Sequence, residues 1–187
     1  KVVTVLFADL VGFTTRAEHM DPEDVGSMLR GYHAQVAREL RRFGGTVEKF
    51  IGDAVMAVFG APIAHEDDPE RAVRAALEIH RWAMEHGQGL RVRIGINTGE
   101  ALVSLGSEVE QGQGMVAGDV VNAAARLQVA AEPNSALVGE ETYQQTMRLV
   151  EYEPIGRVEA KGMSLPLLAW RPIRPRARIG GALGSEV

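Results

Sequence analysis

The feature that most constrains this chain is the order of strand-like and helix-like segments over its first hundred residues. Apolar, β-branched runs predict strands, whereas apolar residues that recur every three or four positions predict helices. The predicted strands cover 1–8, 46–51, 54–59 and 90–97, and the predicted helices begin at Asp21 and Asp68. The order is therefore strand, helix, strand, strand, helix, strand, which predicts an antiparallel or mixed sheet with helices on one face.

Both predicted helices begin with the same local device. The sequence DPE occurs at 21–23 and again at 68–70. Asp is a favoured cap, Pro suits the first helical position, and acids in the first turn complement the helix dipole. The apolar stripe of the first helix continues from Val25 to Phe43, and the glycine pair at 44–45 ends it.

The fold class predicted from this order is α+β, with a ferredoxin-like βαββαβ core and extra C-terminal strands and helices. A Gly-Asp pair at 52–53 marks the turn of the central hairpin. We expect 101–105 to pair with 90–97, and 107–114 to be a loop. The further predicted elements are helices at 118–131 and 140–147 and strands at 136–138, 152–158 and 165–171. The catalytic or binding domain would then span 1–171, with 172–187 as a linker or flexible tail.

Composition excludes several classes of function. The chain has 187 residues, enough for one domain with a sizeable core, and a formal net charge of -5, which argues against nucleic acid as a partner. It has no cysteine, which excludes disulfides and thiolate metal sites and favours an intracellular, cytoplasmic location. No apolar run is long enough for a membrane segment. The chain begins at Lys1 instead of Met, so we expect additional domains in a longer protein.

Two aspartates stand at places where the predicted sheet would bring them together. Asp9 follows the first strand, and Asp53 lies in the hairpin turn. Each alone is explained equally well as a turn residue. In a βαββαβ sheet, however, the first strand and the central hairpin are neighbours. Two converging carboxylates are suited to a pair of Mg²⁺ or Mn²⁺ ions beside a nucleotide.

Three further polar residues have both a functional and an ordinary interpretation. Lys49 lies inside an otherwise apolar strand, where it is either a ligand for a substrate or a solvated edge residue. Asn122 and Arg126 are one helical turn apart among alanines. They could bind a ribose and a phosphoryl group, because a guanidinium matches phosphate oxygens. The alternative is a polar stripe on a surface helix.

Other motifs are absent or weaker. The sequence has no G-x-x-x-x-G-K-[ST] phosphate loop, and its glycines lack the spacing of a dinucleotide fingerprint. The run HEDD at 65–68 could bind a metal ion. Acids that precede a helix more often complement its dipole, and we favour that explanation.

Five segments together resemble a known family, the catalytic domain of class III nucleotidyl cyclases, which makes cyclic AMP or cyclic GMP. Each segment alone is weak evidence, but all five occur in the family's order and spacing and cover nearly everything before the tail. They are VLFADLVGFT at 5–14, VEKFIGDAVMAVFG at 47–60, IGINTGE at 94–100, GDVVNAAARL at 118–127 and EAKGMSLPLLAW at 159–170.

The resemblance implies a metal and phosphate site. Asp9 and Asp53 match the two metal-binding aspartates, and the carbonyl of Leu10 matches a further ligand for two Mg²⁺ or Mn²⁺ ions per active site. The phosphate-binding turn that begins at Leu10 corresponds to Val11, Gly12, Phe13 and Thr14.

The resemblance also implies residues for the base, the ribose and the reaction. Lys49 matches a purine-recognising lysine, Asn122 an asparagine that orients the ribose, and Arg126 an arginine that stabilises the transition state. Lys161 matches a lysine for the terminal phosphate. Met115 stands where the family usually has Asp, Thr or Ser as a second base contact, and its thioether is only a weak acceptor.

The implied activity is adenylate cyclase, because guanylate cyclases that resemble this family carry an acid where Lys49 stands. The ribose 3′-oxygen of ATP would attack the α-phosphorus and expel pyrophosphate. Family members place the aspartates of one chain opposite the Lys, Asn and Arg of another, so the resemblance implies a head-to-tail homodimer. With Met115, the discrimination between ATP and GTP would be weaker than usual, or the reaction slower.

Two alternatives stay open. The chain could be a cyclase-like domain without turnover that senses nucleotides or dimerises, or it could be a guanylate cyclase. Diguanylate cyclases also have a βαββαβ core, but FIGDAV at 50–55 lacks their glycine-glycine-acid turn.

Overall fold

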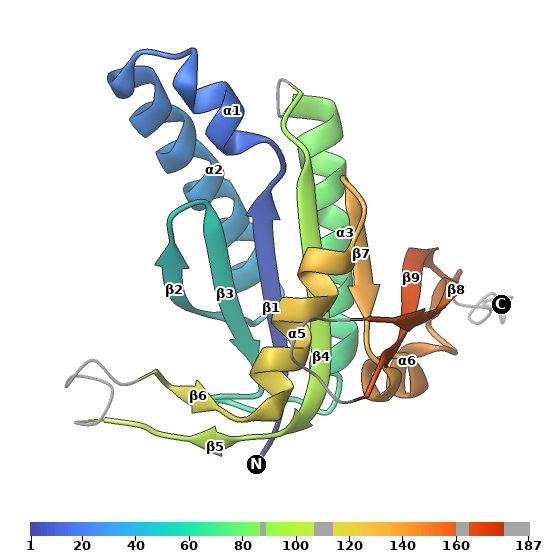
Figure 1. The fold of residues 1–187 in the computed structure, drawn as a ribbon. Helices are drawn as coiled ribbons and strands as arrows, with labels where there is room; N and C mark the ends of the chain where they lie inside the picture. Colours follow the sequence, from blue (N-terminus) through green and yellow to red (C-terminus); the bar gives the residue numbers. More distant parts are fainter. Residues whose placement is uncertain (87–88, 107–113, 160–164, 178–187) are drawn as a thin grey trace, which may run out of the picture.

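A seven-stranded sheet forms the centre of the molecule (Figure 1). The computed structural model describes residues 1–86, 89–106, 114–159 and 165–177. The strand order is β2-β3-β1-β4-β7-β9-β8. The bounds of these strands are β1 Val2–Leu10, β2 Thr46–Ile51, β3 Ala54–Phe59, β4 Val92–Glu100, β7 Ser135–Val138, β8 Val150–Val158 and β9 Leu167–Pro175. The predicted α+β fold with a βαββαβ core is confirmed, because β2, β3, β1 and β4 are neighbours in antiparallel register.

Helices cover both faces of this sheet. Their bounds are α1 Phe13–Glu18, α2 Pro22–Arg42, α3 Asp68–His86, α5 Asp119–Ala130 and α6 Glu140–Thr146. The predicted cap of α2 is present, since the N–H of Glu23 donates to Oδ1 of Asp21 at 3.3 Å. None of the helices in the described ranges is long and apolar enough to cross a membrane.

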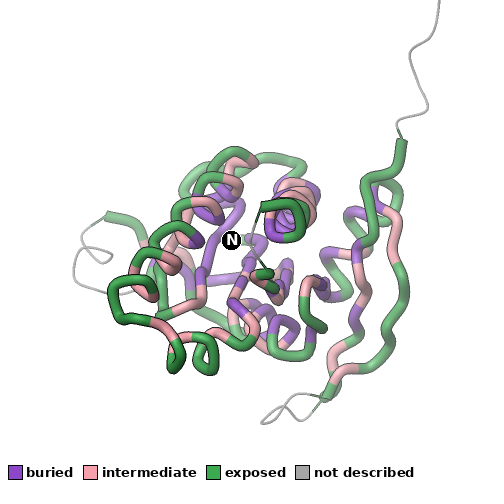
Figure 2. The backbone as a smooth tube through the Cα atoms, turned by 90° about the horizontal axis from the view of Figure 1, so that it is seen from above, coloured by how far each residue is buried: buried purple, intermediate pink, exposed green. Residues whose placement is uncertain are grey.

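The two faces of β1 belong to different apolar clusters, because successive side chains of a strand point to opposite sides. Leu6 and Ala8 pack in the cluster that contains the apolar side chains of α2 and α3. Val3 and Val5 pack in a second cluster with residues of α5. Figure 2 shows the buried stretches gathered in the middle of the molecule and the exposed ones around them. The expectation of helices on one face therefore holds for α2 and α3 but not for α5.

Helix α5 lies directly on β4. An added Cβ at Gly95 would lie 2.3 Å from the carbonyl oxygen of Ala124 and 2.3 Å from the backbone nitrogen of Gln128. No side chain fits between these two backbones. The glycine therefore fixes how closely α5 approaches the sheet.

Two local expectations were wrong, and one short helix was missed. The first strand does not end before Asp9 but continues to Leu10, because the backbone of this central strand still pairs with β4, with Asp9 opposite Arg93. The helix α1 was not predicted, since its six residues are too few to show a period. The segment at 101–105 does not pair with β4. Its strand β5, Leu102–Val103, pairs with β6, Val116–Ala117, in a separate two-stranded sheet.

Candidate active site

Asp9 and Asp53 lie at the same end of the sheet. Strand β1 runs antiparallel to β3 with Ala8 opposite Val55, so the end of β1 meets the start of β3. Asp53 occupies the turn that leads into β3, and Figure 1 shows this turn beside the point where β1 leads into α1. The structure thus brings the two predicted acids together, as the sequence order indicates.

The electrostatics of Asp9 show how close the two acids are. Burial raises the pKa of Asp9, and the charge of Asp53 raises it further. The side-chain amide of Gln128 and the charge of Arg93 lower it in part. A buried carboxylate whose ionisation is disfavoured by a neighbouring acid is a group that a divalent cation would stabilise.

The buried hydroxyl of Tyr32 lies near enough to this pair of acids to be affected by both charges. Tyr32 is 1% exposed, and its hydroxyl oxygen has no hydrogen-bond partner in the described ranges. Burial raises the pKa of this hydroxyl, and the charges of Asp9 and Asp53 raise it further. The buried floor of the site is therefore polar but uncharged.

The donor set at Asp9 and Asp53 fits Mg²⁺ or Mn²⁺ in one particular way. Among the described residues there is no group of three or more His, Cys, Asp or Glu side chains that could hold a metal ion. Mg²⁺ is commonly bound by one or two carboxylates together with substrate phosphates and water. Two carboxylates suit that mode, in which a phosphate-containing ligand would complete the coordination.

The segment from Leu10 to Thr14 forms a tight turn into α1. The side chain of Leu10 is buried, so only its backbone is available to a ligand. Gly12 has φ 70°, a left-handed conformation that glycine adopts without strain, and it stands directly before α1. The N–H of Val11 already donates to the carbonyl of Arg91 at 2.8 Å. The N–H groups of Phe13, Thr14 and Thr15, in the first turn of α1, have no intrahelical acceptor by helix geometry.

Asn122 and Arg126 lie on the outer side of α5. Asn122 is exposed and Arg126 is half-buried, whereas Ala123, Ala124 and Leu127 are buried toward the sheet. Figure 1 shows α5 crossing the sheet on the face opposite α2 and α3. In the part of the chain that the structure describes, Arg126 forms no ion pair with either Asp9 or Asp53. One chain therefore presents these two groups separately.

Lys49 and Met115, the candidate base-recognising residues, both lie near Met56 of β3. Lys49 pairs across the strands with Met56, and its side chain is 49% exposed. Met115 is buried in the same apolar cluster as Met56. Lys161 lies outside the described residues, as does the predicted loop for the most part.

Three residues of this region were not predicted as site residues. Tyr32 is part of the predicted apolar stripe, and only its hydroxyl distinguishes it. Gln128 is buried on the apolar face of α5, and Glu48 is a charged residue next to Lys49 inside a strand. The signal that could have found the last two is a polar residue at a position whose neighbours are apolar.

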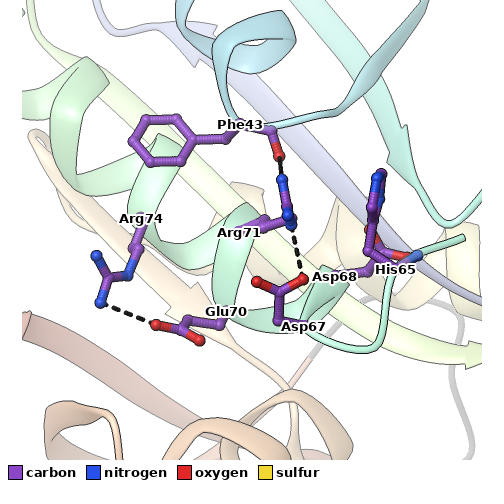
Figure 3. Close-up of polar contacts among 7 residues, drawn as sticks. All are labelled: Phe43, His65, Asp67, Asp68, Glu70, Arg71 and Arg74. Atoms are coloured by element: carbon purple, nitrogen blue, oxygen red, sulfur yellow. Dashed lines mark hydrogen bonds and ion pairs between the residues drawn. The ribbon is translucent and has the colours of Figure 1, made fainter.

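The acidic run at 65–68 lies at the start of α3 and makes structural contacts there. Asp68 accepts a hydrogen bond from the backbone N–H of His65 at 2.7 Å (Figure 3). The guanidinium of Arg71 pairs with Asp67 at 2.7 Å and also reaches the carbonyl of Phe43 at 3.5 Å. These contacts fasten the start of α3 to the end of α2.

Comparisons with known proteins give matches over most of this chain. The family model described as the adenylate and guanylate cyclase catalytic domain matches residues 1–170. A protein named adenylate cyclase 1 from Rhizobium meliloti is 34% identical over 175 residues, which cover 88% of this chain but only 26% of the relative. The chain thus spans about a quarter of that protein.

The similar solved structures include both an adenylyl cyclase and a guanylyl cyclase. The adenylyl cyclase CyaB from P. aeruginosa superposes with a TM-score of 0.85 at 29% identity, covering 96% of this chain and 97% of CyaB. The guanylyl cyclase Cya2 also has a TM-score of 0.85, at 30% identity, with 96% and 95% coverage. A match over nearly the whole chain, in sequence and in fold, means that it belongs to the family of adenylate and guanylate cyclase catalytic domains.

Proposed function

We propose that this chain is an adenylate cyclase domain, which converts ATP to 3′,5′-cyclic AMP and pyrophosphate for intracellular signalling. One observation supports this most strongly. A single chain carries both the converging pair Asp9 and Asp53 and the outward-facing pair Asn122 and Arg126. A domain that had lost turnover would have no need to keep both sets.

In the proposed mechanism, Asp9 and Asp53 hold Mg²⁺ or Mn²⁺. When bound, these ions lower the pKa of the attacking ribose 3′-hydroxyl and neutralise the triphosphate. Arg126 meets the negative charge that develops on the α-phosphoryl group as the 3′-oxygen attacks and pyrophosphate leaves. Asn122 holds the ribose so that the attack is in line with the leaving group.

The triphosphate would bind at the turn before α1. Gly12 lets the chain turn sharply there, and the N–H groups from Phe13 and Thr14 onward donate to phosphate oxygens. Thr14 is exposed and adds a hydroxyl donor. Lys161 is proposed to contact the terminal phosphate.

The site is proposed to form between two copies of the chain. The acids lie at one end of β1, whereas Asn122 and Arg126 lie on the outer side of α5 with no ion pair to them in the described residues. A second copy in head-to-tail orientation would place its Arg126 opposite the first copy's acids. Such a two-fold arrangement produces two equivalent sites per dimer.

Lys49 is the proposed contact to the base. An ammonium group only donates hydrogen bonds, so it matches the N1 acceptor of adenine. Because ATP is the proposed substrate, we also propose that the domain works in the cytoplasm. Further domains of a longer protein would control its activity.

The test is to incubate the purified chain with ATP or with GTP, each with Mg²⁺, with Mn²⁺ or with EDTA. We expect cyclic AMP and pyrophosphate in equal amounts, only when a metal ion is present. Asp53→Asn should abolish the product, whereas Glu151→Asn, an exposed acid on β8, should not. Cyclic GMP as the sole product would instead identify a guanylate cyclase. If a folded dimer makes neither product, the enzymatic proposal is wrong.

A further inference from the structure

The acid Glu48 has no role in the mechanism above, yet its side chain is turned toward the base-recognising residues. A β-bulge lies between Val47 and Lys49. Val47 packs in the cluster with α2 and α3, and the ring of Phe50 lies 4.6 Å from that of His33 on α2. Val47 and Phe50 therefore share one face although they are three positions apart. The bulge places both Glu48 and Lys49 on the opposite face.

The carboxylate of Glu48 is buried between both base-recognising positions. Its side chain is 5% exposed, and Oε1 lies 4.0 Å from Nζ of Lys49. The backbone N–H groups of Met115 and Val116 face the carboxylate and lower its pKa, although burial, the largest effect, raises it. Neither carboxylate oxygen has a fully formed hydrogen bond within the described ranges.

The segment before Met115 is shaped to leave room for this carboxylate. A Cβ added at Gly114 would lie 2.6 Å from Oε1 of Glu48. Any side chain at that position would displace the acid. The contact between Glu48 and 114–116 is thus part of how the two chain segments fit together.

Stability alone does not explain a carboxylate at this position. Burying a charged group costs free energy unless the group is paired and hydrogen-bonded. Here the compensating charge is Lys49, whose side chain is half exposed, and the oxygens keep unused acceptor capacity. An apolar residue would fill the same space at a lower cost.

Met115 supplies the reason for such a group. Its side chain is buried among apolar residues and offers no donor and only a weak acceptor, so it cannot hold the ammonium of Lys49 or contact a purine by hydrogen bonds. Some other group must orient Lys49 if it is to select a base.

We propose, on the basis of the adenylate cyclase function proposed above, that Glu48 is the positioning residue of the base site. It holds the ammonium of Lys49 against the segment at 114–116 and thereby sets the preference for adenine over guanine. The negative charge beside Lys49 favours the 6-amino group of adenine and disfavours the 6-oxo group of guanine. Glu48 thus supplies the acceptor that position 115 lacks.

The experiment compares kcat/KM for ATP and for GTP in four proteins: the original chain, Glu48→Gln, Glu48→Gln combined with Met115→Asp, and the control Glu151→Gln. We expect Glu48→Gln to lower the ATP:GTP ratio by about tenfold or more, because the negative charge that holds Lys49 and favours the 6-amino group is lost. Met115→Asp should restore most of the ratio in the double variant. The control Glu151→Gln should leave the ATP:GTP ratio unchanged, because Glu151 pairs with Arg174 on the surface.

Two outcomes would overturn this proposal. One is an ATP:GTP ratio within about twofold of the original in a Glu48→Gln protein of unchanged melting temperature. The other is a lower ratio that Met115→Asp does not restore, because a merely structural role would behave in that way. If Glu48→Gln lowers the melting temperature, Glu48→Asp is measured as a second variant. It keeps the negative charge, so its ATP:GTP ratio should stay near that of the original chain.

The test also separates this proposal from the proposed function. If the original chain forms no cyclic nucleotide, cyclase activity is excluded but the base site can still be examined. ATP and GTP are then competed against a fluorescent adenine nucleotide in the presence of Mn²⁺. A change in the ratio of their affinities in Glu48→Gln supports the role of Glu48, and an unchanged ratio overturns it.

Discussion

The charge of Asp53, in the β2–β3 turn, acts on Asp9, near the end of the central strand β1, and opposes the ionisation of Asp9. Burial raises the pKa of Asp9, and the charge of Asp53 raises it further. The chain without a bound cation therefore holds a carboxylate in a place that disfavours its charge. Strain of this kind is typical of sites that are built for a ligand and lower the stability of the free protein.

We first predict that Asp9→Asn stabilises the metal-free chain and abolishes activity. Because the pKa of Asp9 is raised in the folded chain, the unfolded chain loses the Asp9 proton at a lower pH than the folded chain does. The free energy of unfolding therefore falls as pH rises from 3.8 through the folded pKa, and this loss persists at neutral pH. Removing the charge should raise the melting temperature in EDTA at pH 7 by about 2–4 °C. The same variant should show no further rise with Mn²⁺ and nucleotide, whereas the original chain should. A lower melting temperature in EDTA would contradict this.

Our second prediction concerns the shared site. Arg126→Ala should reduce turnover by about 10²- to 10³-fold, because it removes a group that stabilises the transition state. Equal amounts of Asp53→Ala and Arg126→Ala chains should together recover about a quarter of the original activity, since half of the dimers are mixed and each has one intact site. The measurement is cyclic AMP formed after mixing, with heterodimers verified by differently tagged chains. An inactive mixture that contains heterodimers would exclude the two-chain site.

Gly95→Ala is predicted to disturb both stability and turnover. The added Cβ would lie 2.3 Å from backbone atoms of α5, so the helix must move away from β4. We expect a loss of at least about 1–3 kcal/mol in denaturant unfolding and a large loss of activity. Gly31→Ala on α2 is the matched control, because nothing lies within 4 Å of its added Cβ. It should gain about 0.5–1 kcal/mol from helix propensity.

The fourth prediction is that His80 makes the fold sensitive to acid. Burial lowers the pKa of His80 to about 4, and its Nε2 donates to the carbonyl of Val92 at 3.1 Å. Below its ordinary pKa of 6.5 the unfolded chain binds the proton first, so stability falls as pH falls from 6.5 toward 4. The loss between pH 7 and pH 5 should be on the order of 2 kcal/mol.

His80→Gln should flatten this dependence, because the neutral amide does not titrate and can still donate to Val92. Urea unfolding at several pH values measures it. His19→Gln serves as the control, since His19 is exposed. If the slope of stability against pH is the same in His80→Gln and in the original chain, His80 is not its source.

Much of the fold could be predicted from the sequence because its elements have clear signals. The start of α2 carries its cap at Asp21, and the hairpin turn carries a Gly-Asp pair. The end of β1 was misplaced because main-chain pairing with β4, beyond the last residue that pairs with β3, keeps Asp9 in the strand despite its charge. The periodicity of apolar residues predicts which side chains are buried. It does not predict which strand a backbone segment pairs with, so this pairing could not be predicted from the sequence.

The convergence of Asp9 and Asp53 could be predicted from topology, because neighbouring strands bring their ends together. The position of Glu48 could not, since it depends on a bulge that shifts the alternation of side chains by one residue. The floor of the site at Tyr32 was likewise hidden, because a tyrosine in an apolar stripe looks like an ordinary core residue. The functions of all these residues remain predictions.

The strand order has a consequence for how this protein can diverge. Asp9, a proposed metal ligand, lies on β1, between β3 and β4 in the interior of the sheet, whereas Glu48 and Lys49 lie on β2 at its edge. A substitution on an edge strand disturbs neighbours on one side only. If Glu48 and Lys49 have the roles proposed above, mutations on β2 can change the choice of nucleotide with little effect on Asp9, and relatives with different substrates can arise from one scaffold by few steps.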